Sequence, residues 1–450
     1  MGPRRRAAAG PLPWTAAVVA GLVCGLVARG APGPVVEAVE AGSAGAPADA
    51  PLAERVARRP RGTIRVATYN ASLNRATAGG LQRALAAPGD PQATRIARVL
   101  RHVRPDVLLL NEFDYDARGE SARSFARHYL EAASEDAASP PLRYPYRFTA
   151  PVNTGVPSGL DLDRDGRSGG PGDALGFGAF PGQYGMVVYS RFPIDRRAAR
   201  TFRQLRWASM PDAVLPPGWY DAAALALQPL SSKSHWDLPL PLPGGRRLHL
   251  LASHPTPPVF DGPEDRNGRR NHDEIRFWAD YLSGAEADWI VDDRGARGGL
   301  ADGASFVVLG DLNADPVDGD SFASAIHPLL GHPRIDASTA PASAGAAAAA
   351  ARQGGTNLQQ HGDPRFDTAD FGERGAGGGN LRTDYLLPSR DLPVCQSGVY
   401  WPTPQDPEFA WVNDDTAASS DHRLVWIDVA LDGRCGADPQ GSDRSTPTGQ

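Results

Sequence analysis

Short apolar runs recur along this chain, and most of them end at a polar residue. Such runs, rich in β-branched and aromatic residues and bounded by turn residues, are typical of buried strands. They are Ile64–Tyr69, Val107–Leu110, Tyr184–Tyr189, Leu248–Ser253, Phe306–Leu309, Tyr385–Leu387 and Leu424–Val429. Helical spacing occurs at Pro91–Val103, Ser121–Ala133 and Asn271–Leu282. Strands and helices spread over residues 63–435 predict one α/β domain of two packed sheets flanked by helices.

The N-terminal segment has the pattern of an export signal. Three arginines at positions 4–6 precede the apolar stretch 11–28, which predicts a signal peptide over residues 1–30. The small residues of a cleavage site lie at 28–30 or at 39–41. The alternative is an uncleaved membrane anchor, because about 18 apolar residues can just span a bilayer. We expect an exported, extracellular protein.

Other segments depart in composition from the predicted domain. Residues 31–62 are predicted to be a disordered linker, residues 436–450 a disordered tail, and the Ala-rich segment 337–355 an exposed insertion. Beyond the predicted signal peptide only Cys395 and Cys435 remain. In an exported chain two cysteines most simply form one disulfide.

Charge narrows the classes of protein that fit. The chain has 450 residues and a formal net charge of −6, and Lys233 is its only lysine. This balance argues against a protein that coats nucleic acid by bulk electrostatics, although it is compatible with a local basic groove.

Three acidic motifs lie at the edges of the last predicted strands. They are Gly-Asp-Leu-Asn at 310–313, Thr-Asp-Tyr at 383–385 and Ser-Asp-His at 420–422. Residues two apart in an extended segment point the same way, so Asp311 and Asn313 can address one phosphate or water. Neighbouring strands would place Asp384 against His422, which would fix the imidazole tautomer and raise its basicity.

Polar residues also border the earlier strands. Asn70, Glu112 and His254 follow strand ends, and Tyr184 begins a strand. A carboxylate such as Glu112 at the mouth of a buried strand is a natural ligand for a hard cation such as Mg²⁺. His254 can donate to a phosphate oxygen in a transition state. Together with the three acidic motifs, these residues indicate a metal-assisted phosphoester hydrolase.

The complete set of motifs resembles the endonuclease/exonuclease/phosphatase superfamily, whose fold is that of deoxyribonuclease I. The resemblance covers about residues 63–432 and rests on Tyr69-Asn70, Asn111-Glu112, Tyr184-Gly185-Met186, Ser253-His254 and the three acidic motifs. It implies a four-layered α/β sandwich, two packed mixed β-sheets flanked by helices, with the site at one end of both sheets.

The resemblance also implies roles for the site residues. Glu112, with Asn70 and Asp421 nearby, would bind Mg²⁺, Mn²⁺ or Ca²⁺. His422, held by Asp384, would be the general base, or Asp311 would take that role. Asn313 and His254 would hold phosphoryl oxygens, and Tyr184 would line the pocket. Ser72 stands two residues after Asn70, where many nucleases of the family carry Asp or Asn, and no basic, aromatic-interleaved helix is evident.

Two loops add candidate binding residues. Asp161, Asp163 and Asp165 followed by Gly166 match the start of a calcium-binding loop, although position 12 is a glycine rather than Glu. The alternative is an exposed Asp-rich loop. In the polar stretch after His254, we expect Arg266, Asn267 and Arg269 to contact substrate, because arginine grips phosphate bidentately.

These patterns predict an exported, divalent-metal-dependent phosphoesterase that hydrolyses a small phosphodiester or phosphomonoester by attack of water. The alternative is an extracellular nuclease acting on DNA or RNA, which the charge balance does not favour. A lipid phosphodiesterase is a third hypothesis, and a catalytically inactive binding module on the same fold is an alternative of another class. No stable protein partner is implied, and we expect a monomer.

Overall fold

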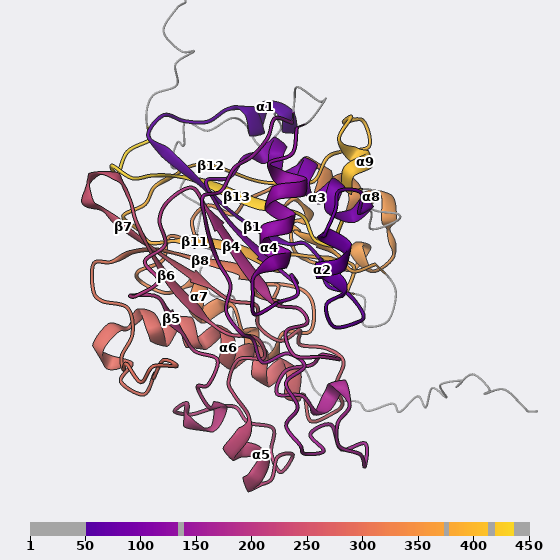
Figure 1. Cartoon of the computed structure of the whole chain (residues 1–450), viewed down its shortest axis with the longest axis vertical. Helices are drawn as coiled ribbons and strands as arrows, with labels where there is room; N and C mark the ends of the chain where they lie inside the picture. The colour runs from indigo at the N-terminus through magenta and orange to yellow at the C-terminus, as the bar shows by residue number, and fades with distance from the viewer. Residues whose placement is uncertain (1–50, 134–138, 373–377, 413–418, 436–450) are drawn as a thin grey trace, which may run out of the picture. The chain divides into compact units, whose positions relative to one another are not determined.

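The protein consists of two β-sheets packed face to face between helices, as the computed structural model shows (Figure 1). The structure describes residues 51–133, 139–372, 378–412 and 419–435, all of which fall in one compact unit. The predicted signal peptide, the linker up to residue 50 and the predicted tail at 436–450 lie outside the described residues.

The first sheet has six strands in the order β12-β13-β1-β2-β4-β3. In that order they span Val394–Val399, Val425–Ala430, Thr63–Asn70, Val107–Asn111, Met186–Ser190 and Tyr146–Phe148. The second sheet has five strands in the order β11-β8-β7-β6-β5. These span Asp384–Pro388, Ser305–Asp311, Arg247–Ala252, Trp236–Pro241 and Arg200–Thr201. A separate two-stranded ribbon pairs β9 (Ala369–Asp370) with β10 (Asn380–Leu381).

The bounds of the helices are α1 Leu52–Ala57, α2 Gly80–Leu85, α3 Pro91–Val103, α4 Glu120–Phe125, α5 Ala222–Leu227, α6 Arg266–Leu282, α7 His327–Leu330, α8 Ala344–Gln353 and α9 Phe409–Val412. Helices α1 to α4 pack on the outer face of the first sheet, and α6 and α7 pack on that of the second. A π-helical turn, Ala126–Leu130, continues α4. Helix α3 begins at Pro91 after the cap Asp90, whose carboxylate accepts the Ala93 amide at 2.9 Å.

The period-two alternation of the strands produces the layers. In β2, Leu108 and Leu110 pack toward α3 and α4, whereas Val107 and Leu109 pack between the sheets. In β8, the odd-numbered Val307 and Leu309 face the other sheet, and Phe306 and Val308 face α6. Successive strand residues point to opposite faces, so each strand feeds two apolar layers. The predicted four-layered α/β sandwich is confirmed.

Two segments are more ordered than their composition suggests. The predicted linker was wrong over residues 52–57, where α1 buries Leu52 and Val56, and the Arg55 guanidinium donates to the Ser397 carbonyl at 2.8 Å. The predicted exposed insertion at 337–355 was wrong as well. Helix α8 packs Ala346 and Ala349 into the layer between the sheets, where small side chains permit close approach.

The predicted disulfide joins Cys395 in β12 to Cys435, with the two Cα atoms 5.3 Å apart. It attaches the end of the described chain to the edge of the first sheet. Within the part of the chain that the structure describes, no helix is both long enough and apolar enough to cross a membrane.

Candidate active site at the sheet edges

The predicted site residues converge because the strands that carry them end at a common edge. Strands β1 and β2 run parallel, as do β7 and β8, so their carboxyl ends lie together. β11 runs antiparallel to β8 and pairs its first residue, Asp384, with the last residue of β8, Asp311. His422 lies just before β13, which runs antiparallel to β1. Residues far apart in sequence therefore meet at one end of both sheets.

Buried contacts link five of these side chains. His422 Nδ1 lies 2.8 Å from Asp384 Oδ2, and His422 Nε2 lies 3.7 Å from Asp311 Oδ2. The same Asp311 oxygen accepts the Asn70 amide at 3.0 Å and lies 3.3 Å from His254 Nε2. The predicted Asp384–His422 contact is confirmed. Its predicted origin in neighbouring strands is wrong, because β11 and β13 belong to different sheets that face each other.

Both carboxylates of this cluster are held by further hydrogen bonds. Thr368 Oγ1 donates to Asp384 Oδ2 at 2.8 Å. The Asn313 backbone amide donates to Asp311 Oδ1 at 3.0 Å. Gly310 permits this geometry: a Cβ at that position would lie 2.0 Å from the Ser253 carbonyl oxygen. The glycine of the Gly-Asp-Leu-Asn motif is thus required where β8 passes β7.

Burial and the neighbouring charges set the protonation states of the cluster. Burial alone would lower the pKa of His422, but the carboxylates of Asp384 and Asp311 raise it well above its ordinary value. Burial would raise the pKa of Asp311, but His422 and His254 hold it below its ordinary value. Burial and the nearby Lys233 charge lower the pKa of His254 to about 4. At neutral pH the cluster therefore contains a charged His422, an ionised Asp311 and a neutral His254.

A second acidic group adjoins the cluster. Burial, followed by the Asp421 charge, raises the pKa of Glu112 to about 7. Asn74 Nδ2 donates to Glu112 Oε2 at 2.8 Å. The carboxylates of Glu112 and Asp421, beside the amide of Asn70, form an oxygen-rich set of the kind that hard divalent cations prefer. These residues therefore fit a divalent metal ion, because its charge would relieve the repulsion.

Strained backbone also marks this edge. Glu112, Tyr184 and Asn313 have positive φ values of 56°, 55° and 52°. Non-glycine residues seldom adopt the left-handed region, and when they do they often lie at functional sites. The side chains of these residues border the two cavities described next.

Two cavities open on the cluster and share Glu112 and His254 in their walls. The first, of about 530 Å³, is also lined by Tyr184, Arg266 and Asn267. The second, of about 740 Å³, is also lined by Asp311, Asn313, Asp421 and His422. The structure thus brings all predicted catalytic and metal-binding residues together; among them, only Asn70 and Asp384 do not line a cavity, and they contact Asp311 and His422 from behind.

The three predicted substrate-binding residues of the 254–271 stretch do not all lie at the same place. Arg266 borders the first cavity and pairs with Glu264, Nη1 to Oε1 at 2.6 Å. Asn267 also borders it, but its amide donates to the Val259 carbonyl at 2.7 Å. Arg269 is not among the residues that line either cavity, and its guanidinium lies over the Phe322 ring, 4.6 Å from the centroid. Helix α6 begins at Arg266 and turns these residues in different directions.

The Asp-rich loop is compact. Asp161, Asp163 and Asp165 each offer a carboxylate oxygen, and these oxygens lie within 4.8 Å of one another. Gly166 has φ 86°, as the sharp turn requires. The loop is closed by the buried Asp173, which accepts the Leu162 amide at 2.7 Å.

Several site residues have only a weak signal in the sequence. Lys233 lines the first cavity beside His254 and stands out only as the single lysine of the chain. Arg270 lines the same cavity from α6, among many similar arginines. Asn74 and Thr368 contact Glu112 and Asp384 from loops that carry no motif.

A four-layered α/β sandwich with an acid, imidazole and amide cluster at one end of both sheets defines the deoxyribonuclease I-like class. A profile described as the Endonuclease/Exonuclease/phosphatase family matches residues 67–422, and the chain belongs to this family. Enzymes of this family are generally metal-dependent hydrolases of phosphoesters. None of the curated proteins compared with the chain matches it.

Solved structures of similar fold share little sequence with this chain. An endonuclease/exonuclease/phosphatase from Beutenbergia cavernae DSM 12333 is 18% identical, with a TM-score of 0.46, over 84% of this chain and 73% of that one. Sphingomyelinase C from Streptomyces griseocarneus is 16% identical, with a TM-score of 0.41, over 81% and 99%. A Staphylococcus aureus beta toxin variant with bound magnesium ions is 11% identical, with a TM-score of 0.39, over 81% and 99%.

Proposed function

We propose that this protein is a divalent-metal-dependent phosphoesterase that hydrolyses a small phosphodiester or phosphomonoester by attack of water on phosphorus. One observation carries the proposal. The buried Asp384–His422–Asp311–His254 cluster adjoins the acidic pair Glu112 and Asp421 where two cavities meet. Proton transfer and charge neutralisation are the requirements of phosphoester hydrolysis, and this arrangement supplies both.

The directions of the pKa shifts support Asp311 rather than His422 as the general base. A base must be unprotonated, and the pKa of Asp311 is held below its ordinary value. His422, whose pKa is raised, carries a positive charge, and Asp384 orients it. In the proposed step, water attacks phosphorus, its proton passes to Asp311, and the bond from phosphorus to the leaving oxygen breaks. The charged His422 stabilises the negative charge that develops on the phosphoryl oxygens.

Other polar groups complete the proposed site. His254 and Asn313 border the second cavity and would hold phosphoryl oxygens. Burial raises the pKa of Tyr184, so its hydroxyl keeps its proton and can protonate the leaving oxygen. Glu112, Asn70 and Asp421 would hold Mg²⁺ or Mn²⁺. Such an ion supplies positive charge next to the phosphoryl group.

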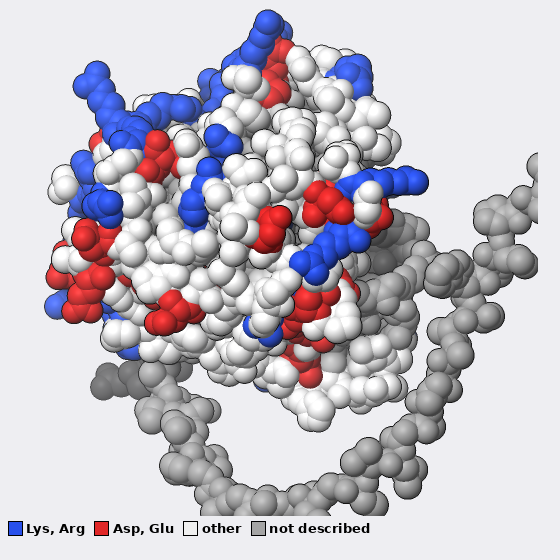
Figure 2. Space-filling model, turned by 90° about the horizontal axis from the view of Figure 1, so that it is seen from below, with Lys and Arg blue, Asp and Glu red and all other residues white. Residues whose placement is uncertain are grey.

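The linings of the cavities support a small substrate over a nucleic acid. Among the described residues that line the second cavity there is no lysine or arginine, whereas its acids include Asp315, Asp318 and Asp320. In Figure 2, basic and acidic side chains are interspersed on the face in view. A duplex carries one charge per ~1.7 Å of axis, so a binding surface for it would need a continuous basic track.

We also propose that the protein is exported and acts as a monomer, and that its Asp161–Asp163–Asp165 loop binds a structural Ca²⁺. The Cys395–Cys435 disulfide supports an oxidising compartment. The calcium proposal is supported by the converging carboxylate oxygens of the loop and by the turn at Gly166.

Hydrolysis assays test the proposed function. Bis-p-nitrophenyl phosphate, p-nitrophenyl phosphate, a p-nitrophenyl choline phosphodiester and DNA are incubated with the protein, with and without EDTA. We expect Mg²⁺- or Mn²⁺-dependent release of nitrophenol and slower cleavage of DNA. Preferential cleavage of DNA would instead support a nuclease. No metal-dependent hydrolysis of any of them would support a catalytically inactive binding module.

A further inference from the structure

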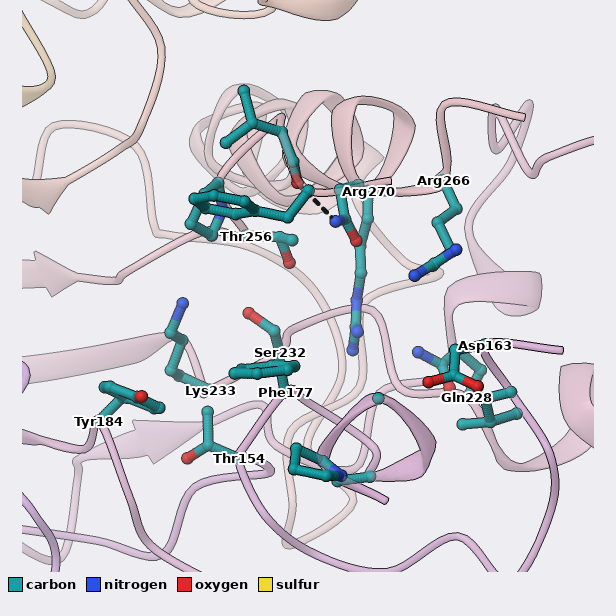
Figure 3. Close-up of a pocket in the computed structure, with 18 of the residues that line it drawn as sticks. Thr154, Asp163, Phe177, Tyr184, Gln228, Ser232, Lys233, Thr256, Arg266 and Arg270 are labelled. Carbon is teal, nitrogen blue, oxygen red and sulfur yellow. Dashed lines mark hydrogen bonds between the residues drawn. The ribbon is translucent and has the colours of Figure 1, made fainter. Parts of the chain in front are cut away.

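Lys233, the only lysine of the chain, is buried at the inner end of the first cavity with most of its hydrogen-bonding capacity unused (Figure 3). Its ammonium donates to the Pro255 carbonyl at 3.3 Å. An ammonium has three N–H donors, and among the described residues the other two have no acceptor. No carboxylate of the described chain lies within ion-pair distance of it. The carboxylates of Glu274, Glu112 and Asp311 act on it only from a distance, so two N–H donors of a buried ammonium stay free to bind an anionic ligand.

Arg270 presents a similar excess of donors. Its Nε–H donates to the Leu230 carbonyl at 2.9 Å, and Nη2 donates to the carbonyls of Leu175 and Pro229 at 2.8 and 2.9 Å. These bonds use three of the five guanidinium N–H groups. The two Nη1 protons have no acceptor among the described residues. The three carbonyls fix the guanidinium, so the free Nη1 edge is oriented in advance.

Lys233 and Arg270 extend into the same space from opposite walls (Figure 3). Between them lie Ser232 and Thr256, and the buried Thr256 Oγ1 has no hydrogen-bond partner. The nearby Glu274 is already occupied by backbone amides, those of Ser232 at 2.8 Å and Thr256 at 2.6 Å. Unused N–H and O–H donors from two cationic side chains and a hydroxyl therefore gather in this part of the cavity, which favours an anion.

This space is continuous with the proposed reaction centre. The Pro255 carbonyl that accepts from Lys233 also accepts from Asn313 Nδ2 at 3.1 Å. Glu112 and His254 belong to the walls of both cavities. A volume of about 530 Å³ is in the range of small-molecule sites. A ligand whose phosphoryl group lies at Asn313 and His254 can thus extend past Lys233 toward Arg270.

We propose that the first cavity is a subsite for a second acidic group of the substrate, a carboxylate or phosphate held by Lys233, Thr256 and Arg270. This inference rests on the proposed function and narrows it, because the substrate is then a small phosphoester with another anionic group. Alkyl and quaternary ammonium groups, by contrast, have no acceptor and leave these donors unpaired, and a site built to form hydrogen bonds strongly disfavours such groups.

The single lysine provides a direct test that does not depend on turnover. The full-length protein is labelled with ¹³C at lysine Cε, so that one side-chain signal reports Lys233. It is titrated in the presence of Mg²⁺ with two non-hydrolysable phosphonates, 3-phosphonopropionate and propylphosphonate, which has the same phosphonate but no carboxylate. We expect the carboxylate to strengthen binding by at least about tenfold and to shift the Lys233 signal. 2-Phosphonoethyl phosphonate, titrated in parallel, distinguishes a phosphate from a carboxylate as the second group, and inorganic phosphate gives the affinity of a single phosphoryl group.

Two variants localise the effect. Lys233→Met keeps the length of the side chain and loses one weak hydrogen bond, and Thr256→Val keeps the shape and loses an oxygen without a partner. We expect both to fold and to reduce the preference for 3-phosphonopropionate to about threefold or less. Three results would overturn the inference: binding of propylphosphonate as tight as that of both 3-phosphonopropionate and 2-phosphonoethyl phosphonate, absence of binding by all of them, or a preference unchanged in both variants. If the protein hydrolyses nitrophenyl phosphates but shows no such preference, only this inference fails. If it hydrolyses none, the proposed function fails.

Discussion

Asp384 belongs to one β-sheet and His422 leads into the other, yet their side chains meet at 2.8 Å, Nδ1 to Oδ2. The proposed catalytic imidazole precedes β13, which begins at Val425, and the first residue of β11 in the facing sheet holds it in place. Rigid elements hold such geometry more closely than loops do.

Replacing Asp384 with Asn tests this contact. Asp384→Asn keeps the shape of the side chain but removes the negative charge that orients His422 and keeps it protonated. We expect kcat/KM to fall roughly 100- to 10,000-fold with little change in substrate affinity. Steady-state kinetics and ligand titration measure the two effects. The matched control is Asp432→Asn, an exposed carboxylate outside the site. Near-wild-type kcat/KM in Asp384→Asn would exclude the proposed role of the pair.

Glu112 makes stability depend on pH when no metal is bound. Its pKa in the folded protein is raised from 4.5 to about 7. The folded protein therefore holds this proton more tightly than the unfolded chain does. As a result, the free energy of unfolding decreases as pH rises from about 4.5 to 7. In EDTA, we expect wild type to lose about 1–3 kcal/mol more than Glu112→Gln between these limits, since the side chain borders solvent in both cavities.

Urea unfolding with and without Mg²⁺ measures this difference. Above pH 7 added Mg²⁺ is expected to stabilise wild type but not Glu112→Gln, because ion binding to the folded state shifts the unfolding equilibrium. Glu286→Gln, at an exposed position, serves as the control. Identical pH profiles for wild type and Glu112→Gln would remove Glu112 from the proposed metal site.

Arg266 and Arg269 form a matched pair on α6, because only Arg266 borders the first cavity. Arg266→Gln is expected to raise KM about three- to tenfold for a phosphoester that carries a carboxylate, through loss of a charged donor. Arg269→Gln makes the same change of charge, and its KM should stay close to that of wild type. Equal effects of the two substitutions would mean that only the overall charge of the helix matters.

The Asp-rich loop predicts stabilisation by calcium. With Ca²⁺ at about 100 times its Kd, a single site contributes roughly 2.7 kcal/mol to the free energy of unfolding. Calorimetry should show a higher Tm in Ca²⁺ than in EGTA for wild type but not for the double variant Asp161→Asn/Asp163→Asn. Asp302→Asn, almost fully exposed, is the control. If Ca²⁺ did not change the Tm of wild type, the loop would not be a calcium site.

The fold class and most of the site could be predicted because their signals are local. Apolar runs that end in Asn70, Glu112 or Asp311 identify strands and the side chains at their ends. Sheet membership could not be predicted, because it depends on long-range pairing that a period-two pattern does not encode. The roles of Lys233 and Arg270 could not be predicted either, because they depend on which N–H groups of the two side chains have no acceptor in the folded protein. Alanines of α8 were misjudged because composition does not reveal a close-packed interface.

Hydrolysis in ¹⁸O-labelled water tests the central claim most directly. A nitrophenyl phosphodiester is incubated with wild type and with Asp311→Asn, with Mg²⁺ and after EDTA, and the products are analysed by mass spectrometry. The proposed mechanism predicts one ¹⁸O atom in the phosphoryl product that wild type forms with metal. It also predicts that the rate falls roughly 100-fold or more when the metal or the Asp311 carboxylate is removed. Label in the alcohol, or an unchanged rate in Asp311→Asn, would contradict it.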